Sequence, residues 1–129
     1  MPAALVVERD AVLRNIIRSV LTAQGFEIVD AANVAEAHAL TDLVLNPPVD
    51  LLILGHASAG GGDPLQNIHF VERLLSQAPT IKVLVISECP YQVVVEENGI
   101  PKDGCFLQGP FAAAQLLDTV RSILEPRIQ

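Results

Sequence analysis

The chain has 129 residues, of which 50% are hydrophobic and 18% charged, and its formal net charge is −7 at pH 7. This length suits one domain with a buried core, and the hydrophobic content excludes a disordered chain. Negative charge would repel nucleic-acid phosphates and anionic membranes, and the absence of tryptophan removes one of the usual stacking platforms for single-stranded bases. We therefore expect a single domain, residues 1–129, that binds neither nucleic acid nor membrane.

The cysteine content and the N-terminal segment bear on where the protein works. Cys89 and Cys105 are too few for a disulfide framework and too far apart for a paired-cysteine motif. The first residues carry neither a basic leader nor an apolar stretch long enough to cross a bilayer. We expect a soluble cytoplasmic protein with reduced thiols.

Strand and helix patterns alternate along the chain. Short apolar runs predict strands that are buried on both faces, and apolar residues at spacings of three and four predict amphipathic helices. In chain order these are a strand at 3–7, a helix at 13–21, a strand at 26–30, a helix from Asn33 to Val44, a strand at 51–54, a helix from Ile68 to about Ala78, a strand at 83–86, a helix at 91–98, a strand at 104–107 and a helix at 116–124.

Breakers and caps support several of these boundaries. Gly25 is placed to end the first helix, and Asn33 followed by Glu36 is typical of a helix N-cap. The segment 93–95 is β-branched and would suit a strand, but Pro90 before it and Gly99 after it favour a helix.

Five strand–helix units in alternation predict an α/β domain of flavodoxin-like (βα)5 type. Parallel strands need crossover helices, and these cover both faces of a doubly wound five-stranded sheet. Ligands bind such sheets at the carboxyl ends of the strands. The residues at those ends are Glu8, Arg9, Gly55, His56, Ser87, Glu88, Gln108 and Gly109.

Four sequence blocks at these strand ends resemble the signatures of response-regulator receiver domains, the signalling modules of two-component and phosphorelay pathways. They are LVVERD at 5–10, DLLILG at 50–55, VLVIS at 83–87 and FLQGPF at 106–111. The resemblance covers almost the whole chain, and the blocks have the order and spacing of that family.

The resemblance implies a phosphorylation site whose key residues are replaced here. The family places two acids after the first strand to hold Mg²⁺, where this chain has Glu8 and Arg9. A guanidinium in place of an acid removes a ligand and repels the metal. The third strand of the family ends in the aspartate that accepts the phosphoryl group, and the chain has Gly55 there.

The remaining family positions are partly kept. Ser87 matches a hydroxyl residue that senses the phosphoryl group, whereas Gly109 stands before Pro110 in place of the phosphate-binding lysine. Phe106 matches an aromatic residue that couples the pocket to the output face. Phosphoryl transfer depends on positioning and charge neutralisation, so we expect no enzymatic activity, no metal and no cofactor.

The resulting prediction is a degenerate pseudo-receiver. It would act by phosphorylation-independent protein–protein interaction with a signalling partner, or as a homodimer, through the face formed by the fourth predicted helix, the fifth strand and the last helix. The alternative is a small-ligand or nucleotide-binding domain whose crevice is enlarged by Gly55, Gly109 and the glycines at 60–62. A third interpretation keeps phosphorylation alive through His56 or Asp10.

Individual residues allow further expectations. Arg9 either projects its guanidinium into the empty metal position and pairs with Glu8, or is a solvated surface residue. Asp10 is more typical of a helix cap than of a rescued metal ligand. His56 follows the acceptor position by one residue and should point to the other side of the strand.

The other conspicuous residues are expected to be structural. His38 and His69 lack the spacing of metal ligands and should lie on the surface. The glycines at 60–62 favour a flexible loop rather than an anion cradle. Cys89 and Cys105 have no basic neighbour in sequence that would activate them, so both should pack structurally.

Overall fold

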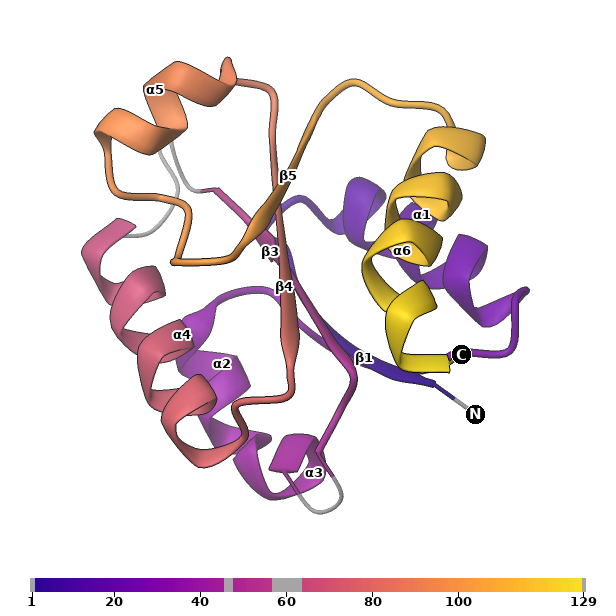
Figure 1. Ribbon diagram of the computed structural model, residues 1–129, viewed down its shortest axis with the longest axis horizontal. Coiled ribbons are helices and arrows are strands. Elements are labelled where there is room, and N and C mark those ends of the chain that lie inside the picture. Colours follow the sequence, from indigo (N-terminus) through magenta and orange to yellow (C-terminus); the bar gives the residue numbers. More distant parts are fainter. Residues whose placement is uncertain (1, 46–47, 57–63, 129) are drawn as a thin grey trace.

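A single parallel sheet forms the centre of the computed structural model, which describes residues 2–45, 48–56 and 64–128. Its strands are β1 (Ala3–Val7), β2 (Glu27–Ala31), β3 (Leu51–Gly55), β4 (Lys82–Ser87) and β5 (Cys105–Gln108). Their order is β2-β1-β3-β4-β5, and every neighbouring pair is parallel (Figure 1). The predicted doubly wound α/β fold is therefore confirmed.

Helices cover both faces of this sheet. They are α1 (Ala11–Thr22), α2 (Val34–Ala39), α3 (Thr41–Leu45), α4 (Pro64–Gln77), α5 (Tyr91–Glu96) and α6 (Ala113–Ile128). Figure 1 shows α1 and α6 side by side on one face, with α2, α4 and α5 on the other. The layers follow from the parallel pairing, because each crossover must return over one face or the other.

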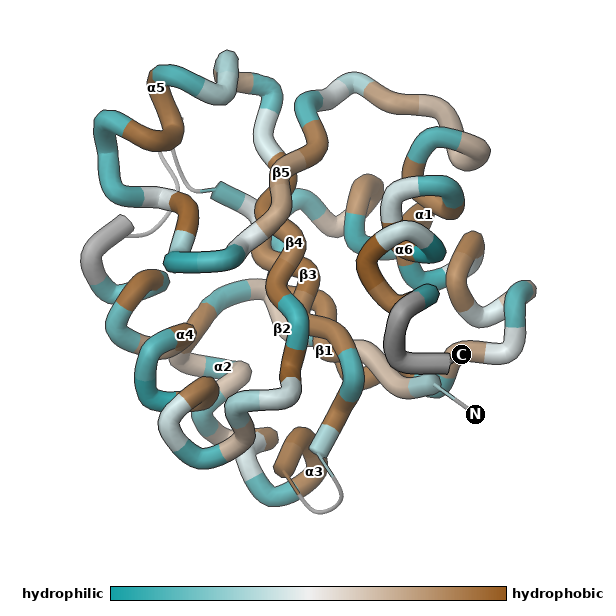
Figure 2. The backbone as a smooth tube through the Cα atoms, in the orientation of Figure 1, coloured by the Kyte–Doolittle hydropathy of each residue, from teal (hydrophilic) through white to brown (hydrophobic). Residues whose placement is uncertain are grey.

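Two apolar clusters form the core, one on each side of the sheet. Leu5 and Leu52 belong to the cluster beneath α2 and α4, whereas Val6 and Ile53 belong to the cluster beneath α1 and α6. Adjacent residues in a strand point to opposite faces, which explains the division. Figure 2 shows the hydrophobic strands enclosed by helices of mixed polarity. Among the described residues no polar or charged residue is buried over its whole surface.

Most predicted elements are confirmed, but the predicted helix from Asn33 to Val44 is wrong. It consists of α2 and α3, separated at Leu40, whose φ of −103° and ψ of 11° leave helical geometry. The Thr41 hydroxyl donates to the His38 carbonyl at 2.7 Å and thereby competes with the helical hydrogen bond. Residues 46 and 47 lie outside the described part of the chain, as do the glycines at 60–62.

The helix predicted at 91–98 is confirmed as α5, which ends at Glu96. The residue that adopts the left-handed conformation after it is Asn98, with φ of 55°, and not Gly99. Asn98 N donates to Val95 O at 3.0 Å and Gly99 N to Val94 O at 2.8 Å. This pair of bonds is the Schellman motif that commonly ends helices.

Candidate functional site

The residues singled out at the strand ends gather at one edge of the sheet. Val7 pairs with Leu54 and Gly55 pairs with Ile86, so the ends of β1, β3 and β4 lie in register. This register brings Glu8, Gly55 and Ser87 to the same edge. Gly109 directly follows β5 at this edge, and its N–H donates to Ser87 O at 2.7 Å.

The Glu8 carboxylate covers Gly55. A Cβ at Gly55 would collide with Glu8 Oε2 and would lie 2.8 Å from Glu8 Cδ. The space where a side chain of residue 55 would begin is therefore filled by the carboxylate from the neighbouring strand. The sequence identified both residues, but it gave no indication that one fills the other's place.

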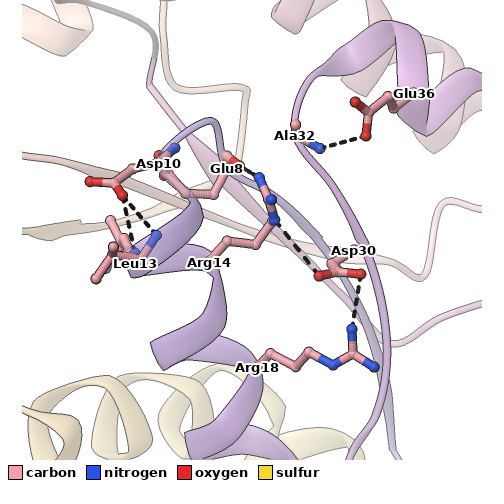
Figure 3. A network of polar contacts seen from close by, with 9 residues as sticks. Glu8, Asp10, Leu13, Arg14, Arg18, Asp30, Ala32 and Glu36 are labelled. Atoms are coloured by element: carbon pink, nitrogen blue, oxygen red, sulfur yellow. Dashed lines mark hydrogen bonds and ion pairs between the residues drawn. The ribbon is translucent and has the colours of Figure 1, made fainter.

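Glu8 is held by its surroundings on two sides. Its Oε1 accepts a hydrogen bond from Asp10 N at 3.1 Å, and its backbone carbonyl accepts one from Arg14 Nη1 at 2.7 Å. Arg14 Nε also lies 3.8 Å from Asp30 Oδ2, and Arg18 pairs with Asp30 at 3.3 Å. Figure 3 shows this network, which fastens the loop after β1 to α1 and β2.

Sequence reasoning missed the arginines of this network. Arg14 and Arg18 are four residues apart on α1 and therefore share one face of that helix. This spacing was the available signal, but their partner Asp30 is recognisable only once β2 is placed beside α1.

Burial raises the pKa of Glu8. Desolvation by burial is the largest cause, and the Asp10 charge acts in the same direction. Hydrogen bonds from the backbone of Asp10 and Arg9, and the charge of Arg14, oppose it. Because the folded-state pKa is raised, the ionised carboxylate destabilises the fold above that pKa, and the penalty disappears as the pH falls toward 4.5, the group's ordinary value.

We expect Glu8→Gln to raise the stability of the protein at pH 7. The amide oxygen can still accept from Asp10 N but carries no charge to desolvate. The gain should shrink as the pH approaches 4.5, where wild type becomes protonated. Thermal melts of wild type and variant at several pH values measure this difference, and Glu72→Gln at an exposed position of α4 is the control. A gain that is independent of pH would contradict the assignment.

Arg9 and Asp10 have different surroundings. Arg9 is exposed, and the arginine whose charge lowers the pKa of Glu8 is Arg14. Asp10 is the N-cap of α1, and its Oδ1 accepts from Val12 N at 2.9 Å and Leu13 N at 3.3 Å. The capping role predicted for Asp10 is confirmed, and these two bonds commit one of its carboxylate oxygens to the helix.

The residues at this edge do not fit the Mg²⁺ that the resemblance implies. Mg²⁺ requires several oxygen ligands in octahedral geometry. Glu8 offers one carboxylate, Asp10 is committed to its cap, and Arg9 contributes a positive charge. Among the described residues no group of three His, Cys, Asp or Glu side chains is arranged to hold a metal ion.

Ser87 and Gly109 lie at the other end of the edge. Ser87 Oγ accepts a hydrogen bond from Cys89 N at 2.9 Å, so the retained hydroxyl holds the turn after β4. A Cβ at Gly109 would meet Glu88 and Phe111 at 3.6 Å or more, which is ordinary van der Waals contact. Position 109 therefore has room for the Cβ of a lysine side chain.

Phe106 is half-buried on β5 and contacts α5. Its ring meets that of Tyr91 edge to face, with centroids 5.5 Å apart and an interplanar angle of 68°. Tyr91 itself is 57% exposed, and Val93 and Val95 on the same helix are 40% and 42% exposed. Tyr91 and Val95 are four residues apart and share one face of α5, whereas Val93 lies toward the other side of the helix. Phe106 thus joins the sheet to an exposed apolar surface on α5, here called the α5 surface and defined by Tyr91 and Val95.

His56 lies on the other side of the strand from the Cβ position of Gly55, as predicted, and its ring contacts the end of α5. Its side chain is only 2% exposed, and its Nε2 lies 3.1 Å from Glu97 Oε1. The other two histidines, His38 and His69, are exposed on α2 and α4, which confirms their predicted surface positions. Cys89 and Cys105 are both half-buried, and they pack against opposite core clusters.

A cleft of about 460 Å³ opens at this edge between the ends of β1, β2 and β3 and the beginning of α4. Its polar described lining consists of Glu8, Arg9, Asn33, His56, Gln66 and Asn67. Gly55 lines the cleft as expected, although Glu8 fills the space over its Cβ position, whereas Gly109 is not among the described residues that line it.

The strand order and this edge define the fold of CheY-like response-regulator receiver domains. CheY4 of Vibrio cholerae superposes with a TM-score of 0.77 at 21% identity, covering 96% of this chain and 99% of that protein. A response regulator from Thermotoga maritima gives 0.75 at 20% identity, covering 97% and 98%. TrrA from the same organism, in complex with Mg²⁺-BeF, gives 0.73 at 18% identity, covering 96% and 100%.

Comparisons of sequence give no further relationship. No family model matches the chain, and no curated protein matches it. At these low identities the structural likeness establishes the fold. Within the described residues, none of the helices is long and apolar enough to cross a membrane.

Proposed function

We propose that this chain is a receiver-type module of a two-component or phosphorelay pathway whose phosphoacceptor site is degenerate. It would act through phosphorylation-independent contact with a protein partner in the cytoplasm, without enzymatic activity or a cofactor. The fold it shares with response regulators and the position of Glu8 support this proposal.

The observation that carries the proposal is the carboxylate over Gly55. An acceptor aspartate at this position would need the volume that Glu8 occupies. Glu8 itself is unsuited to accept a phosphoryl group, because it is half-buried and its carboxylate is hydrogen-bonded to the start of α1. Arg9 in place of the second acid and Gly109 in place of the lysine remove the charges that transfer would need.

The α5 surface supports an interaction role. Tyr91 and Val95 are exposed apolar side chains on one face of this six-residue helix, and Tyr91 contacts Phe106 on the strand where the family's coupling aromatic lies. Exposed apolar groups of this kind are typical of protein contact surfaces. We propose that a signalling partner, or a second copy of the chain, binds at this face.

We expect the native chain to gain no phosphoryl group from a small-molecule phosphodonor in the presence of Mg²⁺. Intact mass spectrometry after incubation measures the outcome, with CheY4 of Vibrio cholerae as a receiver of similar fold treated in parallel. A phosphorylated native chain would contradict the proposal, and peptide mapping would then begin at His56 and Asp10.

The cleft supports a second candidate, the binding of a small ligand. A volume of about 460 Å³ lies in the range of small-molecule sites, and it opens where doubly wound sheets bind ligands. A ligand that binds the folded state stabilises it by RT ln(1 + [L]/Kd) and therefore raises the melting temperature. A thermal-shift screen of metabolites and nucleotides, repeated on Asn67→Ala, distinguishes this candidate from a pure interaction module.

A further inference from the structure

We propose that His56 is a latch that fixes α5 to the end of β3. The inference rests on the proposed function, because α5 carries the surface through which a partner would bind. It adds the side-chain contact that holds this surface in place without a phosphoryl group.

The helix α5 needs such support because it is short. Six residues are too few for a stable isolated helix, so its stability must come from tertiary contacts. Val94 supplies one such contact as its fully buried residue, and the Tyr91–Phe106 edge contact supplies another near its beginning. His56 acts at the opposite end, where the helix gives way to the loop that leads to β5.

Contacts of both the backbone and the ring hold His56 in position. Its N–H donates to Ile86 O at 2.8 Å, which continues the β3–β4 pairing by one residue. Its ring is 2% exposed, and Nε2 lies 3.1 Å from Glu97 Oε1. A residue in line with the sheet therefore holds the last turn of α5.

The turn after α5 is shaped to receive this ring. A Cβ at Gly99 would lie 2.6 Å from His56 Nδ1 and 2.8 Å from Cε1, closer than real Cβ atoms approach their neighbours. The left-handed position of the Schellman motif falls on Asn98, so Gly99 is not required there by its backbone angles. The glycine is instead required by the close approach of the His56 ring and of Val94 Cγ1, which would also lie 2.8 Å from this Cβ.

The latch also connects two parts of the molecule. His56 directly follows Gly55 and lines the cleft on one side, while its ring contacts the end of α5 on the other. A change that pulls this side chain toward the cleft would remove the contact with Glu97 and Gly99. The position of α5 would then depend on the state of the cleft.

The test is amide hydrogen exchange of the full chain at Asn98 and Gly99, whose N–H groups close the end of α5. We expect His56→Ala and Glu97→Ala each to accelerate exchange there about fivefold, the effect of one lost hydrogen bond. Glu97→Gln keeps an oxygen acceptor and should largely restore protection. Gly99→Ala should accelerate exchange at least as much, because its Cβ displaces the ring.

Matched controls separate the latch from general destabilisation. Glu96→Ala is exposed on the same helix and His69→Ala is exposed on α4, and neither should change exchange at α5. Exchange at the fully buried Leu5 in β1 reports global opening and should stay unchanged in Glu97→Ala. Unchanged protection of Asn98 and Gly99 in Glu97→Ala and Gly99→Ala would overturn the latch, whereas the phosphodonor experiment tests the proposed function independently.

Discussion

The triple variant Arg9→Asp, Gly55→Asp, Gly109→Lys should accept a phosphoryl group from a small phosphodonor and Mg²⁺. It restores the second acid, the acceptor and the cation that the resemblance to receiver domains implies at these positions. Gly109 has room for a side chain, with its nearest neighbours at 3.6 Å or more. At position 55 the new side chain must displace Glu8, whose carboxylate is the end of a flexible side chain and can turn toward a bound metal.

Intact mass spectrometry measures the result as one added phosphoryl group on the variant and none on the native chain. The double variant Arg9→Asp, Gly109→Lys is the matched control, because it rebuilds the charges without the acceptor. Mg²⁺ should stabilise the triple variant against heat more than wild type, since three carboxylates then surround the site. Phosphate on the double variant would show that some other residue is the acceptor and would contradict the assignment of Gly55 to that position.

Ile53→Ala should lower the free energy of unfolding by about 2–5 kcal/mol, a large part of the stability of a domain of this size. Ile53 is fully buried in the central strand β3 and belongs to the cluster beneath α1 and α6. Parallel neighbours on both sides, β1 and β4, fix its backbone, so the surrounding structure cannot close the cavity left by the alanine.

Denaturant unfolding measures the effect as a lower midpoint with an unchanged slope. Val12→Ala is the control, because Val12 is 69% exposed on α1 and its truncation should change stability by no more than about 0.5 kcal/mol. An equal loss in both variants would show that Ile53 is not part of the packed core.

The fold could be predicted from the sequence because its signals are local. Buried parallel strands read as continuous apolar runs, and the runs at 3–7 and 51–54 lie within the observed strands. The Asp10 cap was also predictable, since a helix end takes its cap from residues next to it. The break at Leu40 was missed because a single hydroxyl bond from Thr41 decided it against a continuous apolar stripe.

The sequence by itself determined which residues reach the functional edge, since the ends of parallel strands meet there. Only the tertiary structure decided which contacts these residues make. That Glu8 covers Gly55, that the charge of Arg14 lowers the pKa of Glu8, and that Gly99 makes room for His56 all depend on side chains from different strands and helices. Such contacts join residues up to 47 positions apart, and no local pattern in the chain records them.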